Sequence, residues 1–188
     1  MTGAPESDPQ AMLSLLGSEH GDYKNAVQWF KSQGKGQAPF LISAFNDTHT
    51  SSLQQARIIE TLGELQDDKA IPLLAKSLQE DRWTWDAAQA LGKIGTRAAE
   101  AILTQKLRDP RLNIVKECTK ALAYFKTETA RATLQNLLQH TDAAERYYAA
   151  LSLIQSQPER AVETLRRHLQ QEPDIEVRQL IERFFSKQ

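Results

Sequence analysis

A column of alanine and leucine returns along the chain at intervals of about 30 residues. In four places an alanine is followed by leucines four and eight positions later, beginning at Ala70, Ala99, Ala130 and Ala161, which lie 29, 31 and 31 residues apart. Residues four apart stack on one side of an α-helix. Each copy therefore predicts one helix with an apolar stripe, and the spacing predicts an array of similar units.

The central unit, residues 83–107, shows how each repeat is built. Its first half carries apolar residues on one helical face, at Trp83, Ala87, Leu91 and Ile94. Gly95 then supplies the backbone freedom that ends a helix, and Thr96 is a suitable cap for the next one. The unit is thus predicted to be a pair of helices joined by a tight turn.

A single helical hairpin cannot bury its apolar stripe, whereas stacked hairpins share one continuous core. We therefore predict an all-α chain with one repeat domain over 8–188, a disordered tail at 1–7 and capping helices at both ends. The C-terminal helix is expected at 174–186, as a cap or a half-repeat. The expected hairpins are 22–47, 51–81, 82–109, 112–141 and 142–170.

Two segments carry a resemblance to a known family. Leu91-Gly92-Lys93-Ile94-Gly95 and its earlier echo Leu62-Gly63-Glu64-Leu65 resemble bacterial short HEAT repeats, including those of phycobilin lyases. The resemblance spans roughly residues 22–186 and implies a right-handed α-α superhelix, a HEAT-like solenoid. In the last hairpin the glycines are lost, so that either Leu151 or Leu153 corresponds to Leu122 of the preceding hairpin.

Composition excludes several classes of protein. The formal net charge of -1 argues against a protein that coats DNA, because such proteins are usually basic. The single cysteine, Cys118, cannot form an intramolecular disulfide and fits a reducing compartment. Neither a signal peptide nor an apolar run of about 20 residues is visible in the sequence, so we expect a cytoplasmic protein.

Catalytic and metal motifs are also missing from the sequence. The histidines at 20, 49, 140 and 168 form no HxxxH or HExxH motif, and we expect them at the surface or at helix ends. Deoxyhypusine hydroxylase, a di-iron HEAT-repeat enzyme, carries His-Glu dipeptides on its repeats, and this chain has none, which counts against a metal oxygenase. Cys118 occupies the slot of Ala87 and is expected to be buried and inert. We therefore predict no enzymatic activity, no metal and no cofactor.

Three aromatic positions leave two interpretations open. Trp85 lies two residues after Trp83, so it points away from the core face and either wedges between repeats or forms an exposed anchor. The adjacent pairs Tyr147-Tyr148 and Phe184-Phe185 present the same choice between packing and contact with another chain.

Two polar columns follow the second helices. The reference point is the first leucine of each Ala-Leu-Leu column, and polar residues lie two and five positions after it. In the last four hairpins these polar residues are Lys76, Gln79, Gln105, Arg108, Asn136, Gln139, Arg167 and Gln170. In a HEAT-like stack this face lines the concave surface, and amides both donate and accept hydrogen bonds as peptide groups do. Any solvated helix face is also polar, which is the simpler interpretation.

These columns predict a polar, mildly basic groove. The first hypothesis is a scaffold or adaptor that binds a partly acidic segment of a partner protein, with no membrane, small-molecule or nucleic-acid role. The second is a subunit or chaperone of a modifying enzyme, as the phycobilin-lyase resemblance implies. A nucleic-acid binder is a third, and the net charge disfavours it.

Overall fold

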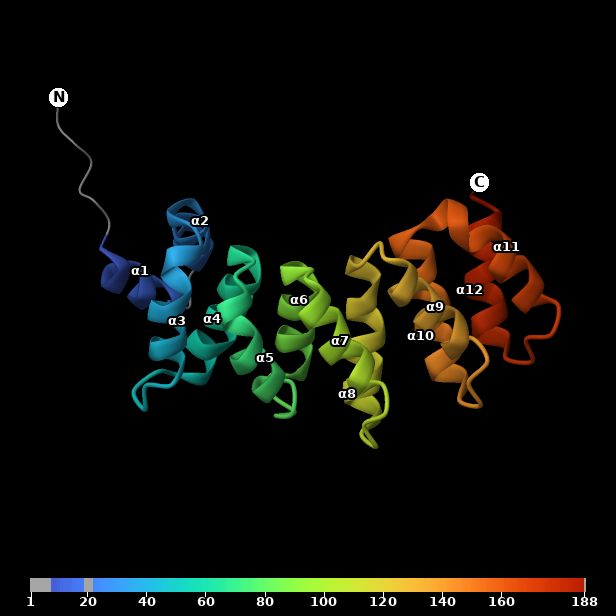
Figure 1. Cartoon of the computed structure of the whole chain (residues 1–188), viewed down its shortest axis with the longest axis horizontal. Helices are drawn as coiled ribbons and strands as arrows, with labels where there is room; N and C mark the ends of the chain where they lie inside the picture. Colours follow the sequence, from blue (N-terminus) through green and yellow to red (C-terminus); the bar gives the residue numbers. More distant parts are fainter. Residues whose placement is uncertain (1–7, 19–21, 188) are drawn as a thin grey trace, which may run out of the picture. The chain divides into compact units, whose positions relative to one another are not determined.

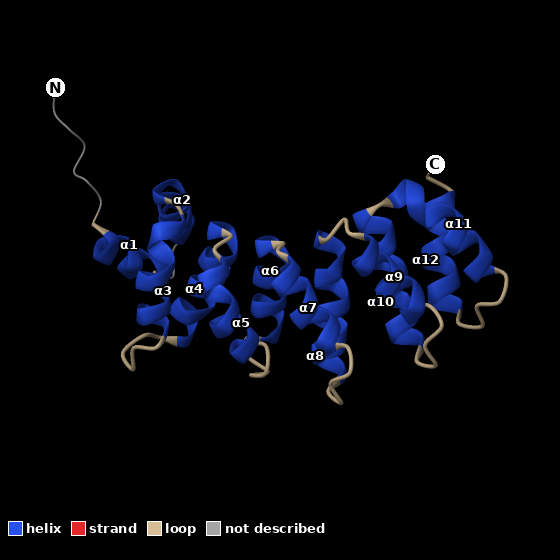
Figure 2. Cartoon of the chain, viewed as in Figure 1, coloured by secondary structure: helices blue, strands red, loops and turns tan. Residues whose placement is uncertain are grey.

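The computed structural model describes residues 8–18 and 22–187, and every regular element in that part of the chain is a helix (Figure 2). The prediction of an all-α chain is confirmed. The expected disordered tail at 1–7 lies outside the described residues, as does His20.

The helices follow one another as short pairs (Figure 1). Their bounds are α1 Pro9–Leu16, α2 Tyr23–Gln33, α3 Ala38–Phe45, α4 Ser52–Leu65, α5 Ile71–Ser77, α6 Thr84–Ile94, α7 Arg97–Lys106, α8 Leu112–Ala121, α9 Glu128–Leu137, α10 Ala143–Ser156, α11 Pro158–Leu169 and α12 Ile175–Phe185. Single 3-10 turns precede α3 and α5 and follow α8. Helices α2 and α3 lie within the first expected hairpin, and α10 and α11 within the last.

The chain divides into two compact units, residues 1–94 and 95–188. The division falls at Gly95, inside the expected hairpin 82–109, where the backbone has a φ of 68°. Only glycine adopts this left-handed conformation without strain, which explains why the helix α6 ends there. Each unit is described by itself below.

In unit 1 the first helices α2, α4 and α6 form one layer, and α3 and α5 pack on α4 and α6. Gly63 allows α4 and α6 to approach closely, because a Cβ atom at this position would lie 2.7 Å from the Cα of Ala90. At the edge of the layer the carboxylate of Glu64 forms ion pairs with Lys31 and Lys93, each with an N–O distance of 2.8 Å. One carboxylate of α4 thus ties α2 and α6 together.

In unit 2 the first helices α8, α10 and α12 form one layer, and α9 and α11 both pack on α10. Helix α12 contacts α10 and α11 through the side where Val177 and Ile181 are buried. It therefore takes the place of the first helix of a further hairpin, as the half-repeat interpretation states. Leu153 is buried and Leu151 is only half-buried, so Leu153 is the equivalent of Leu122.

Local capping agrees with the sequence. The Thr96 hydroxyl accepts a hydrogen bond from the Ala99 backbone N–H at 3.4 Å, and Thr127 caps α9 in the same way at 3.1 Å. Such side-chain caps satisfy backbone donors that have no partner within the first helical turn.

Candidate functional site

The eight residues of the two polar columns are all exposed. Lys76 and Gln79 lie at the end of α5 in unit 1. The other six lie at the ends of α7, α9 and α11 in unit 2. Their binding role stays a prediction, because exposure alone also fits an ordinary solvated helix face.

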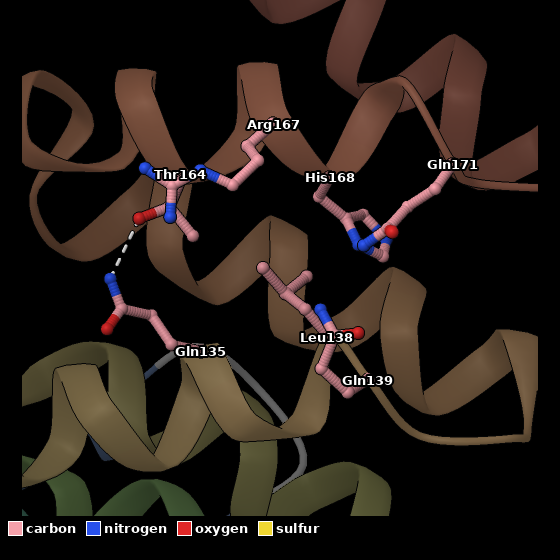
Figure 3. Close-up of a pocket in the computed structure, with 7 residues that line it drawn as sticks. All are labelled: Gln135, Leu138, Gln139, Thr164, Arg167, His168 and Gln171. Carbon is pink, nitrogen blue, oxygen red and sulfur yellow. Dashed lines mark hydrogen bonds between the residues drawn. The ribbon is translucent and has the colours of Figure 1, made fainter.

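In unit 2 the structure brings two of these residues together around one cavity. A cavity of about 220 Å³ lies between the C-terminal halves of α9 and α11 (Figure 3). Its lining residues are Gln135, Leu138, Gln139, Thr164, Arg167, His168 and Gln171. Gln139 and Arg167 belong to the predicted columns, whereas Gln105, Arg108, Asn136 and Gln170 do not line this cavity. Three amides, a guanidinium, a hydroxyl and an imidazole therefore surround a single leucine.

A buried ionic cluster supports one wall of the cavity. The Arg146 guanidinium donates from Nε and Nη2 to the two oxygens of Glu172, at 2.9 and 2.7 Å. The imidazole of His168 lies 2.6 Å from the same carboxylate through Nε2, and the Asp174 backbone N–H donates to it at 2.9 Å. Each carboxylate oxygen thus has two partners. The arginine also donates from Nη1 to the carbonyls of His140 and Thr141.

These contacts determine the charge of the carboxyl group. Burial by itself would raise the pKa of Glu172, but the hydrogen bonds from Arg146, the Asp174 N–H and His168 outweigh burial and hold the pKa at about 2. Glu172 is therefore ionised at neutral pH. An ionised carboxylate can only accept hydrogen bonds, so Nε2 of His168 carries the proton that lies between them.

The second ring nitrogen of His168 is left without a partner. Its Nδ1 atom is buried and makes no hydrogen bond with any described residue. In the neutral imidazole with a proton on Nε2, this atom is a hydrogen-bond acceptor. A buried acceptor without a partner is unusual in a folded protein and suggests a position that a ligand or a water molecule completes.

None of the predicted site residues belongs to this cluster. We expected the histidines at the surface or at helix ends; His49 and His140 are exposed, but His168, near the end of α11, is only 5% exposed. One pattern pointed to the cluster. His168 lies seven positions after the buried Ala161, and Arg146 lies four before the buried Ala150, so both fall on core faces. A charged residue at such a position requires a buried partner.

The remaining candidates separate into exposed and buried groups. Trp85 is 54% exposed, which agrees with the anchor interpretation and not with a wedge between repeats. The rings of Phe184 and Phe185 are half-buried, and Arg166 lies over Phe185. Cys118 is fully buried, as expected, and burial raises the pKa of its thiol to about 12.

Within 8–18 and 22–187, no group of three or more His, Cys, Asp or Glu side chains is placed to hold a metal ion. Over the same ranges, the helices are too short or too polar to cross a lipid bilayer.

Known proteins resemble the chain in sequence and in fold. Human deoxyhypusine hydroxylase is 33% identical over 93 residues, which are 47% of this chain and 30% of the human protein, so the match spans under a third of that relative. The complex of CpcE and CpcF of phycocyanin lyase from Nostoc sp. PCC7120 contains a chain that matches with a TM-score of 0.56 at 20% identity, over 96% of this chain and 76% of that one. An engineered protein matches with a TM-score of 0.50 at 20% identity, over 97% and 92% of the two chains.

The family itself is established by a direct match to the repeats. A family model described as HEAT repeats matches residues 38–117 and 100–183, which together span most of the chain. These ranges contain the helices from α3 to α11 and the Ala-Leu columns from which the repeat was first predicted. The chain belongs to the HEAT-repeat family.

Proposed function

We propose that this protein is a non-enzymatic scaffold or adaptor that binds a partly acidic segment of a partner protein along the polar faces of its second helices. The observation that carries the proposal is the cavity between α9 and α11. There, Gln139 and Arg167 from the predicted columns meet an imidazole that the buried cluster holds in place. Preorganised polar groups of this kind lower the entropic cost of binding.

The charge and chemistry of the site support a protein ligand. No acidic side chain lines the cavity, and Arg167 has an exposed partner, Glu163, at 3.3 Å that an incoming carboxylate can replace. Exposed pairs of this type contribute little stability, so the exchange costs little. The amides can pair with both the donors and the acceptors of an extended peptide. Arg108 and Lys76 add exposed positive charge at the ends of their own helices.

The similarity to deoxyhypusine hydroxylase does not extend to a metal site in the described residues. The matched region covers 30% of the human enzyme, and the described part of this chain holds no candidate cluster of metal ligands.

The test is capture of partner proteins by the immobilised chain, read by mass spectrometry. Reversal of three charges, Lys76→Glu, Arg108→Glu and Arg167→Glu, is expected to abolish capture of the specific partners. The matched control reverses three exposed charges elsewhere, Lys24→Glu, Arg97→Glu and Lys187→Glu, and is expected to retain them. Equal capture by both variants would remove the proposal.

A second candidate is a subunit or chaperone of a modifying enzyme, to which the resemblance of residues 91–95 to phycobilin-lyase repeats points. This role needs a tetrapyrrole site. A change in the absorbance spectrum of a bilin on mixing with the protein would favour it, and an unchanged spectrum would exclude it.

A further inference from the structure

Among the described residues that line the α9–α11 cavity, His168 alone has a buried side-chain polar atom, Nδ1, that makes no hydrogen bond. Glu172 is already saturated by Arg146, the Asp174 N–H and Nε2 of His168. The imidazole cannot turn Nδ1 toward Glu172 without breaking the 2.6 Å contact of Nε2. Figure 3 shows the imidazole directed from α11 toward the side of the cavity where Gln171 and Leu138 lie.

The surroundings of Nδ1 select an uncharged donor. A carboxylate would require a second proton on the imidazole, and the ends of α9 and α11 place partially negative carbonyl groups around the cavity. A cationic donor would meet the guanidinium of Arg167 on the lining and that of Arg146 behind the imidazole. An uncharged N–H avoids both conflicts.

The walls of the cavity carry groups that complement a carboxamide. Gln139 and Gln171 are exposed and bring one amide each, whereas the amide of Gln135 already donates to the Thr164 hydroxyl at 2.8 Å. A carboxamide presents an NH2 group beside a carbonyl oxygen, so it can donate to Nδ1 and accept from a wall amide. The volume of about 220 Å³ is far above the roughly 10–15 Å³ that one water molecule requires, which leaves room for such a group.

We propose that the segment bound by this protein inserts an asparagine or glutamine side chain between α9 and α11, and that its NH2 group donates a hydrogen bond to Nδ1 of His168. This inference rests on the proposed function and names the side chain that the partner presents. Because Nδ1 is closed to solvent, a carboxamide reaches it only when side chains of the cavity wall shift. The exposed Gln139 and Gln171 can rotate without disturbing the core.

The first experiment uses the full chain labelled with ¹⁵N-histidine, and small probes in place of the segment. Acetamide, sodium acetate and methylammonium chloride are titrated at constant ionic strength while the Nδ1 resonance of His168 is followed by NMR. A saturable shift with acetamide alone is expected. A shift with acetate or methylammonium instead, or no saturable shift with any probe because only water occupies the cavity, would overturn the inference.

Wall variants give the second readout without touching the buried cluster. The double variant Gln139→Ala, Gln171→Ala is expected to bind acetamide about tenfold more weakly than the unaltered protein, because no wall amide then donates a hydrogen bond to the carbonyl oxygen of the probe. The matched control Gln155→Ala changes an exposed amide of α10 that does not line the cavity and is expected to leave the affinity unchanged. Equal affinity in all three proteins would count against the wall amides as partners.

The two proposals fail separately. If the probe binds but reversal of Lys76, Arg108 and Arg167 leaves partner capture intact, the proposed function is wrong and the carboxamide site remains. If capture depends on those charges but acetamide never reaches Nδ1, the scaffold role remains and the carboxamide inference is wrong.

Discussion

The guanidinium of Arg146 and the carboxylate of Glu172 lie face to face inside unit 2, joined by two hydrogen bonds of 2.7 and 2.9 Å although 26 residues separate them in the sequence. Arg146 belongs to α10, and Glu172 lies in the loop that leads into α12. The pair therefore attaches the last helix to the middle of its unit. Two-point contacts of this geometry are both stronger and more specific in direction than single ion pairs.

The low pKa of Glu172 predicts how stability depends on pH. Its pKa is about 2 in the folded chain in place of the usual 4.5, so the unfolded chain binds more protons between these values and the free energy of unfolding falls as the pH falls through this window. The full contribution, at most about 3 kcal/mol, is present above pH 4.5. Urea unfolding measured from pH 6 to about pH 2 is expected to show a smaller decrease for Glu172→Gln than for the unaltered protein.

The matched control for this measurement is Glu182→Gln, an exposed carboxylate of α12. It is expected to retain the steep dependence on pH. If the free energy of unfolding fell equally with pH in the unaltered protein and in Glu172→Gln, the pH dependence would not come from Glu172.

Removal of the arginine alone is expected to be more harmful than removal of the pair. Arg146→Met leaves a buried carboxylate without its main partner, which typically costs about 3–5 kcal/mol. The double variant Arg146→Met, Glu172→Gln removes the uncompensated charge, so its free energy of unfolding is expected to lie above that of the single variant. Urea unfolding at pH 7 measures both, and Arg97→Met serves as an exposed control. A free energy of unfolding for Arg146→Met within about 1 kcal/mol of that of the unaltered protein would contradict this prediction.

Gly63 provides a test of the packing between α4 and α6. Gly63→Ala places a methyl group 2.7 Å from the Cα of Ala90, which is backbone and cannot move aside, so a loss of about 1–3 kcal/mol is expected. Gly36→Ala is the matched control, because no atom lies within 4 Å of its added methyl group and its backbone is not in the left-handed region. Thermal unfolding of the two variants is expected to give a lowered midpoint for the first only. The same midpoint for both would show that the helices can separate without cost.

Trp83 and Trp85 are expected to contribute very differently to the free energy of unfolding. Trp83 is 4% exposed and packs edge-on against Phe45 with ring centroids 6.2 Å apart, so Trp83→Ala is expected to cost about 3–5 kcal/mol. Trp85 is more than half exposed, and Trp85→Ala is expected to change the free energy of unfolding by less than about 1 kcal/mol. Urea unfolding followed by circular dichroism compares them. Similar losses for both would mean that Trp85 contributes to the core.

Much of the local structure could be predicted because it depends on neighbours within one or two turns. The spacing of Ala99, Leu103 and similar residues shows which face of each helix is apolar, and Thr96 and Gly95 mark where helices begin and end. The two polar columns could be identified as exposed for the same reason. Their role in binding cannot be read from this spacing, since a solvated face and a binding face have the same composition.

Sequence alone determined the repeat, the helical class and the faces that each helix buries, because apolar periodicity acts within a single helix and needs no distant partner. Tertiary structure decided which polar residues are buried. The spacing places Arg146 and His168 on the core faces of their helices, but it does not identify Glu172 as their partner. Only the packing of α10, α11 and the loop before α12 brings the three side chains within hydrogen-bonding distance. A carboxylate can remain ionised in the interior only where several donors converge on it, and that convergence is a property of packing between elements that no spacing along the chain specifies.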